Sequence, residues 1–262
     1  MRSSTFSRET GMRLMRIVIF YVLVIATWWS VARAEVWSPF LFPAPDAVYR
    51  AMLVNIENGQ IPAAIAASLQ RMAVGYGLSF VFGMSMGLLI ASSKWANETI
   101  GGIVLGIQSL PSITWLPLAV LWFGLSERAI IFVVLMGSAF SIAISARAGI
   151  LGIPPLLQRA AGTLGASRWQ AYLYVVLPGM IPAMVQGMKQ GWSFAWRSLM
   201  AGELLFVSAG LGHLLQVGRD LNNISMVFAV MIVIVIVGVT VDRVIFGRAE
   251  RWVHERWGYA VA

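Results

Sequence analysis

The chain contains no cysteine, which excludes disulfide frameworks, cysteine-ligated zinc, thiol catalysis and iron–sulfur clusters. It is also poor in charge: only 11% of its 262 residues are Asp, Glu, Lys or Arg, whereas a soluble domain carries roughly 25%. So few charges cannot cover a water-facing surface, which excludes an ordinary soluble enzyme. Disorder is excluded as well, because 59% of the residues are hydrophobic and the mean hydropathy is +0.79.

Residues for catalysis are scarce too. Neither lysine, Lys94 or Lys189, follows a glycine, so the chain has no phosphate-binding loop of the kind that hydrolyses ATP. The two histidines, His213 and His254, are far apart in sequence and are predicted on opposite sides of a membrane, which argues against a two-histidine metal site. No Gly-x-Ser-x-Gly nucleophile motif occurs. We therefore expect no catalytic residue, no metal site and no cofactor bound by this chain.

What the chain has instead is long apolar runs, which predict six membrane-spanning helices. The first is expected over residues 17–32, after a basic N-terminal tail at 1–16. A cleaved signal peptide would share this pattern, but Trp28 and Trp29 suit an interfacial end and no small-residue cleavage site follows. We then expect a periplasmic loop with a short helix at 33–61, five spans within 62–246 and a cytoplasmic C-terminal tail at 247–262.

The five later spans are expected at about 62–91, 99–123, 129–146, 178–207 and 224–241. Gly83 and Gly87 have the small-xxx-small spacing that lets membrane helices approach closely. Pro111 and Pro117 interrupt the 99–123 span.

The net charge of +8, from 19 Lys and Arg against 11 Asp and Glu, would suggest nucleic acid in a soluble protein. Here membrane topology explains it, because basic residues collect on the cytoplasmic side. The two tails, Lys94 and the 147–168 segment hold most of the basic residues, and six spans place them all on one side. We expect both termini to be cytoplasmic and the protein to lie in a bacterial inner membrane.

One cytoplasmic segment has a specific pattern. Residues 159–165 read Arg-Ala-Ala-Gly-Thr-Leu-Gly, and Val175 to Pro178 follow after nine further residues. This predicts two short helices separated by Gly165, which permits a sharp turn. Ala160 and Ala161 would present a smooth face that can enter a groove. The alternative is an ordinary amphipathic loop.

The spacing resembles the signature of the type I, binding-protein-dependent family of ABC-importer permeases: Glu-Ala-Ala, three residues, Gly, nine residues, Ile, one residue, Leu-Pro. Arg159 stands where the family pattern has Glu, which leaves the backbone shape intact and puts in doubt any salt bridge of that Glu. The resemblance implies that residues 154–174 form a coupling helix docked in a cleft of an ATPase subunit. The implied coupling residues are Arg159, Ala160, Ala161, Gly162, Leu164, Gly165, Ala166 and Ser167.

Three further runs resemble the nitrate/sulfonate/taurine branch of that family, over roughly residues 40–245. They are 110–124 with its Leu-Pro-Ser-Ile-Thr-Trp-Leu-Pro and Leu-Trp-Phe-Gly, 166–169 with Ala-Ser-Arg-Trp, and Ala-Trp-Arg at 195–197 with Glu203. The resemblance implies an all-α integral membrane protein with six transmembrane helices and a cytoplasmic coupling helix. It further implies a homodimer, two ATPase subunits that bind ATP and Mg, and a periplasmic or lipid-anchored solute-binding protein. Nucleic acid is not an expected partner.

The fifth span carries polar residues that could line a pathway. Lys189, Gln190, Ser193 and Arg197 are three or four residues apart and share a helix face, with Gln186 one turn earlier. Such a cationic and amide stripe suits a passing anion. The alternative is that Arg197 pairs with Glu203 or a neighbouring helix for structural reasons.

Two further sets of polar residues inside the spans need a role: four around proline 111, and Arg71. Gln108, Ser109, Ser112 and Thr114 surround the break at proline 111, and broken transporter helices often line the path. The alternative is a kink absorbed by packing. Arg71 could lie at the mouth of the pathway, but packing or interfacial snorkelling is the stronger interpretation.

The sequence therefore predicts the transmembrane permease subunit of an ABC importer for a small anionic solute, with no bond chemistry of its own. One alternative is a secondary transporter driven by an ion gradient. It would want intramembrane carboxylates, and only Glu203 lies in or near a span. A membrane-bound enzyme is disfavoured by the absence of a catalytic set. The solute itself is not named by the sequence.

Overall fold

The structure is a computed structural model that describes residues 2–205 and 209–258, and every regular element in those ranges is helical. The predicted end of the fifth span at Val207 and the last four residues of the predicted C-terminal tail lie outside them. The chain divides into two compact units. The smaller comprises residues 1–61 and 215–232, and the larger comprises 62–214 and 233–262.

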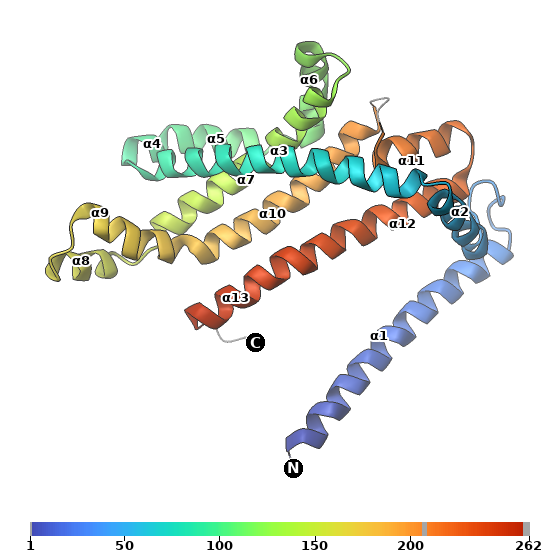
Figure 1. Cartoon of the computed structure of the whole chain (residues 1–262), viewed down its shortest axis with the longest axis horizontal. Coiled ribbons are helices and arrows are strands. Elements are labelled where there is room, and N and C mark those ends of the chain that lie inside the picture. The colour runs from blue at the N-terminus through green and yellow to red at the C-terminus, as the bar shows by residue number, and fades with distance from the viewer. Residues whose placement is uncertain (1, 206–208, 259–262) are drawn as a thin grey trace. The chain divides into compact units, whose positions relative to one another are not determined.

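Three long helices form the core of the larger unit: α3 (Gln60–Ala91), α7 (Glu127–Leu151) and α10 (Leu177–Glu203) (Figure 1). Each is an apolar run long enough to cross a bilayer. The helices α7 and α10 pack against each other along their length. Half of α7 is buried on this account, including a continuous stretch from Ser138 to Ala143.

Small residues set the close approach of these three helices. A Cβ added at Gly87 of α3 would lie 2.6 Å from both the Ala143 carbonyl oxygen and the Ala146 Cβ of α7. A Cβ at Gly191 of α10 would lie 2.9 Å from Ile142 of α7. The small-xxx-small prediction for α3 is therefore confirmed, and van der Waals contact between nearly bare backbones holds the core together.

We expect Gly87→Ala to lower the thermal unfolding temperature of the purified protein, because its methyl group meets backbone that cannot move aside. Overpacking of this kind costs about 1–3 kcal/mol. Gly77→Ala on the same helix is the matched control, since nothing lies within 4 Å of a Cβ there. Unfolding curves in detergent compare the two variants, and equal midpoints would contradict the packing argument.

The third predicted span is broken. It consists of α4 (Lys94–Glu98), α5 (Ile100–Gln108), the 3₁₀ helix η1 (Ser112–Trp115) and α6 (Leu116–Phe123), with a bend of 95° between residues 94–108 and 112–123. Pro111 lies in the bend, where it lacks the N–H that would continue the helix. The first half stays fixed to the core through a buried apolar cluster of Val104 with Ile90 and Phe140.

In the smaller unit, α1 (Arg2–Arg33) and α2 (Pro45–Glu57) precede part of α11 (Leu211–Asp220) and of α12 (Ile224–Val241). The Trp28 indole N–H donates to the Pro43 carbonyl at 3.1 Å, and its ring stacks on Phe228 at 6.0 Å. These contacts tie the first helix to the last long one. On exposed α2, the Arg50 guanidinium one turn away lowers the pKa of Asp46 below its usual range.

Within the described residues, five helices are long and apolar enough to cross a membrane, and the bent pair raises the number to six if it counts as one span. The helix α12 continues through a π-helical segment η3 (Asp242–Phe246) into α13 (Gly247–Trp257). The segment predicted as a C-terminal tail thus begins as a helix. The all-α, multi-span fold class is confirmed.

Candidate functional site

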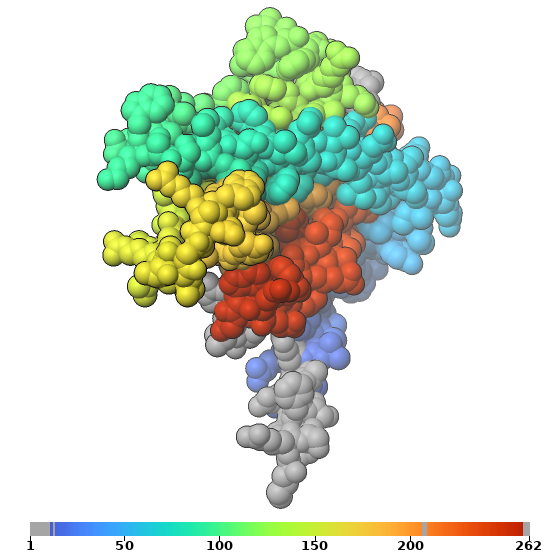
Figure 2. Space-filling model, turned by 60° about the vertical axis from the view of Figure 1, so that its left-hand side comes forward, coloured from blue at the N-terminus to red at the C-terminus, as the bar shows by residue number. Residues whose placement is uncertain are grey.

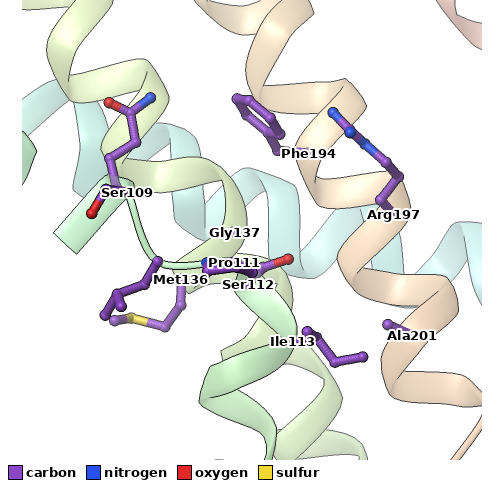
Figure 3. Close-up of a pocket in the computed structure, with 11 residues that line it drawn as sticks. Ser109, Pro111, Ser112, Ile113, Met136, Gly137, Phe194, Arg197 and Ala201 are labelled. Atoms are coloured by element: carbon purple, nitrogen blue, oxygen red, sulfur yellow. The ribbon is translucent and has the colours of Figure 1, made fainter. Parts of the chain in front are cut away.

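A cavity of about 350 Å³ opens at the break in the third predicted span, between that break, α7 and α10 (Figure 3). Volumes of this order hold small-molecule ligands. Thr114 lies outside the lining, because its hydroxyl donates to the Pro111 carbonyl within its own turn. The other pathway candidates around the break do contribute, together with Arg197 from α10. The lining comprises Gln108, Ser109, Leu110, Pro111, Ser112, Ile113, Met136, Gly137, Phe194, Arg197 and Ala201.

Arg197 is the one charged residue among the described residues that line this cavity. Its Nε donates to the Ser193 carbonyl one turn earlier at 3.1 Å, and its guanidinium lies 4.9 Å from the centre of the Phe194 ring. A cation at that distance from an aromatic face is attracted by the ring. The side chain is exposed in the single chain, so its guanidinium is positioned and accessible.

Gly137 of α7 brings the three walls of the cavity together. A Cβ there would collide with the Ser198 hydroxyl of α10 and would lie 3.2 Å from the Ser112 Cβ of η1. A bare backbone at this position lets the break approach α10. The cavity is therefore built by the tertiary packing of the break against α7 and α10.

The polar stripe predicted on α10 does not act as one surface. The Lys189 ammonium forms an ion pair with Glu250 of α13 at 2.9 Å, and the Gln186 amide donates to the same carboxylate at 3.2 Å. Both side chains are thus committed to holding α13 against α10. Gln190 and Ser193 remain exposed on the face that carries Arg197.

A second ionic cluster lies at the C-terminal end of α10. Glu203, at the end of α10, is fully buried and forms an ion pair with Arg71 of α3 at 2.9 Å. It also accepts from the Ser68 hydroxyl at 2.8 Å and from the Gly212 N–H at 3.0 Å. Arg71 reaches Glu127 at the start of α7 as well, at 2.9 Å. The cluster connects α3, α7, α10 and the start of α11.

These pairs decide two alternatives left open by the sequence. Pairing of Arg197 with Glu203 is wrong, because Glu203 is occupied by Arg71. A packing role for Arg71 is confirmed by its burial and its two carboxylate partners.

Sequence reasoning missed three partners: Ser68, Glu127 and Glu250. The signal that could have found them is the cost of an unpaired charge in a membrane, which requires a partner for every intramembrane cation.

The segment between α7 and α10 consists of α8 (Pro155–Thr163), a turn, α9 (Arg168–Ala171) and a π-helical segment η2 (Tyr172–Val176) that runs directly into α10. The turn is a Schellman motif: the Ala166 N–H donates to Ala161 and the Gly165 N–H to Gly162. Gly165 has φ of +82°, which favours glycine. Ser167 then caps α9 reciprocally with Gln170.

The helices α8 and α9 of this segment have no buried residue, and their yellow surface is open in Figure 2. Leu164 is 88% exposed and Leu156 is 74% exposed, although both are apolar. Arg159 and Arg168 are exposed beside them. Large exposed apolar side chains next to charge are typical of a surface that contacts another protein. All the residues predicted for coupling lie on α8, in the turn or at the cap of α9.

Residues 79–254 match the family model described as binding-protein-dependent transport system inner membrane component. The chain belongs to this family. It is therefore a multi-pass permease subunit of an ABC importer in the inner membrane, and its role is transport. Among the described residues of this permease, no group of three or more His, Asp or Glu could hold a metal ion.

Two curated relatives place the permease within the family. The taurine transport system permease protein TauC of Escherichia coli is 29% identical over 220 residues, which cover 82% of this chain and 80% of TauC. The nitrate import permease protein NrtB of Synechocystis is 29% identical over 181 residues, covering 69% of this chain and 66% of NrtB. The predicted nitrate/sulfonate/taurine branch is confirmed.

Solved structures show the same fold. A chain of the inward-facing MetNI methionine ABC transporter matches with a TM-score of 0.60 and 23% identity, covering 74% of this permease and 96% of that chain. An amino acid ABC transporter crystallised with histidines matches with a TM-score of 0.64 and 18% identity, covering 76% and 97%. The family match argues against the ion-gradient alternative, and Glu203, the carboxylate considered for it, is buried in an ion pair with Arg71.

Proposed function

We propose that this permease carries a small anion and is driven by two ATPase subunits that dock on the α8–α9 segment. The observation that carries the proposal is mechanical. The exposed segment leads through η2 into α10 without an interruption, so a push on it reaches the helix that bears Arg197. The Schellman turn and the capping box on α9 fix the angle between α8 and α9 by hydrogen bonds.

Two observations support an anionic solute: the names of two relatives and the charge of the cavity in this chain. Two relatives are named for taurine and nitrate, which carry a sulfonate and a negative charge respectively. In this chain the cavity at the break contains a guanidinium and no carboxylate. A cation there attracts anions and repels cations.

The proposed assembly is a homodimer with two ATP-binding-cassette ATPases and a periplasmic or lipid-anchored solute-binding protein. Gln190, Ser193 and Arg197 are exposed and polar, so they must be shielded from the lipid. A second copy of the chain that encloses a water-filled pathway would shield them. ATP and Mg bind the ATPases, and this chain binds neither. ATPase closure on ATP moves α8–α9 and opens the pathway outward, and hydrolysis resets it. The arginine-rich N-terminal tail, α8–α9 and α13 lie on the cytoplasmic side, as the excess of basic residues favours.

Co-purification tests the assembly. We expect the tagged full-length permease, solubilised mildly from its host with nucleotide present, to bring down an ATPase with a phosphate-binding loop in equal amount. Quantitative mass spectrometry measures the ratio. A homo-oligomer without any ATPase, recovered intact from the same membranes, would contradict the proposal.

A further inference from the structure

We propose that the cavity at the helix break is a binding site for one small organic monoanion per chain, with a negative head group and a short apolar tail, as in ethanesulfonate. The inference rests on the proposed anion pathway and adds a site inside the permease where the solute is selected. It assigns the head group to Arg197 and the tail to the apolar wall formed by Met136 and Ile113.

The charge of the site follows from how the intramembrane cations are neutralised. Arg71 has two carboxylate partners and Lys189 has one, all within the larger unit. Arg197 has none among the described residues, and its one hydrogen bond there uses Nε. Its two terminal nitrogens therefore remain free to bind a ligand. An uncompensated guanidinium inside a span is costly, so it calls for a counter-ion that comes and goes. That counter-ion is a monoanion, since the site carries one positive charge.

The geometry suits an anion that is recognised by several hydrogen bonds. Arg197 is held by the Ser193 carbonyl and by the Phe194 ring, so little conformational freedom is lost on binding. The Gln108 amide and the Ser112 hydroxyl line the same space and can donate to the remaining oxygens of a head group, whereas the Ser109 hydroxyl already donates to the Gly106 carbonyl at 2.6 Å.

The rest of the wall discriminates between solutes. It is apolar, and no carboxylate lines it, so an ammonium group on the tail would be desolvated without a partner. The site therefore favours ethanesulfonate over taurine, which is the same molecule with an added ammonium group. It also favours ethanesulfonate over ethyl methyl sulfone, which has nearly the same shape without the charge.

The test is equilibrium binding of these three probes to the purified full-length permease in nanodiscs, measured by calorimetry. We expect ethanesulfonate to bind at least about tenfold more tightly than either taurine or the neutral sulfone. The sulfone lacks the charge that makes a strong hydrogen bond with Arg197, and taurine brings an ammonium group that would be buried without a partner. Equal affinity for ethanesulfonate and the sulfone would overturn the proposal, and so would tighter binding of taurine. This comparison needs no variant, so it holds whether or not substitutions fold.

Variants then locate the site. We expect Arg197→Gln to weaken ethanesulfonate binding by at least about tenfold and to leave the weak affinity for the sulfone within about twofold. Arg128→Gln is the matched control, because Arg128 is exposed at the start of α7 and lies outside the cavity lining. Unchanged binding in Arg197→Gln, or an equal loss in Arg128→Gln, would overturn the assignment.

Failure here is distinguishable from failure of the proposed function. Binding to the permease alone requires no ATPase. Co-purification of the ATPase with no ethanesulfonate binding would overturn only the internal site. Binding that depends on Arg197, in a chain that recruits no ATPase, would overturn only the proposed assembly.

Discussion

Gly165→Val is expected to abolish ATP-dependent solute uptake while the permease still inserts and folds. The residue lies at the left-handed position of the Schellman turn, with φ of +82°. A non-glycine residue there costs about 1–2 kcal/mol, and a β-branched one resists the conformation most strongly. The chain relieves the strain by changing the angle between α8 and α9, which alters the surface proposed to dock on the ATPase. Uptake into proteoliposomes with the reconstituted ATPase and binding protein measures the loss.

A matched glycine separates coupling from simple strain. Gly59, in the turn between α2 and α3, has φ of +73° and, like Gly165, has nothing within 4 Å of an added Cβ. We expect Gly59→Val to lower stability by a similar amount and to retain uptake and ATPase co-purification. Equal loss of uptake in both variants, or full uptake in Gly165→Val, would contradict a coupling role for the turn.

Glu203→Gln is expected to produce the largest loss of stability. The carboxylate is fully buried, forms an ion pair with Arg71 and accepts hydrogen bonds from the Ser68 hydroxyl and the Gly212 N–H. In the variant, the only carboxylate that still pairs with the buried Arg71 guanidinium is the exposed one of Glu127. Removing one partner of a buried ion pair costs about 3–5 kcal/mol. A large drop in the midpoint of thermal unfolding in detergent, with loss of monodisperse protein, is the expected result.

Asp46→Asn is the control for the loss of a carboxylate, because Asp46 pairs with Arg50 on the exposed surface of α2. Exposed helix pairs contribute little, since water already solvates both charges. We expect its unfolding midpoint to match that of the unaltered chain. Replacing both buried partners, Arg71→Met with Glu203→Gln, should cost less than the sum of the two single changes, because no unpaired charge remains. A Glu203→Gln midpoint equal to that of Asp46→Asn would contradict the argument.

The helices themselves were predictable from the sequence because their causes are local. Apolar length defines a span, and α3 at residues 60–91 and α12 at 224–241 lie where the hydrophobic runs predicted them. The turn at Gly165 was predictable for the same reason, since only glycine takes that conformation freely. The predicted break at Pro111 is present as well, because its missing N–H is also a property of the residue.

Which polar residues form a site was decided only by tertiary structure. The spacing on α10 grouped Lys189 with Arg197, yet Lys189 pairs with Glu250, 61 residues later, and Arg197 does not. Glu203 lies near Arg197 in sequence, yet it bonds Ser68, 135 residues earlier. A helix repeat says which side chains share a face but not what faces them. In a membrane the counter-charge sets the energy of an ion, and its position depends on how distant helices pack. The sequence alone therefore determined the spans, the break and the turn at Gly165, and packing alone decided that Arg197 has no carboxylate partner among the described residues.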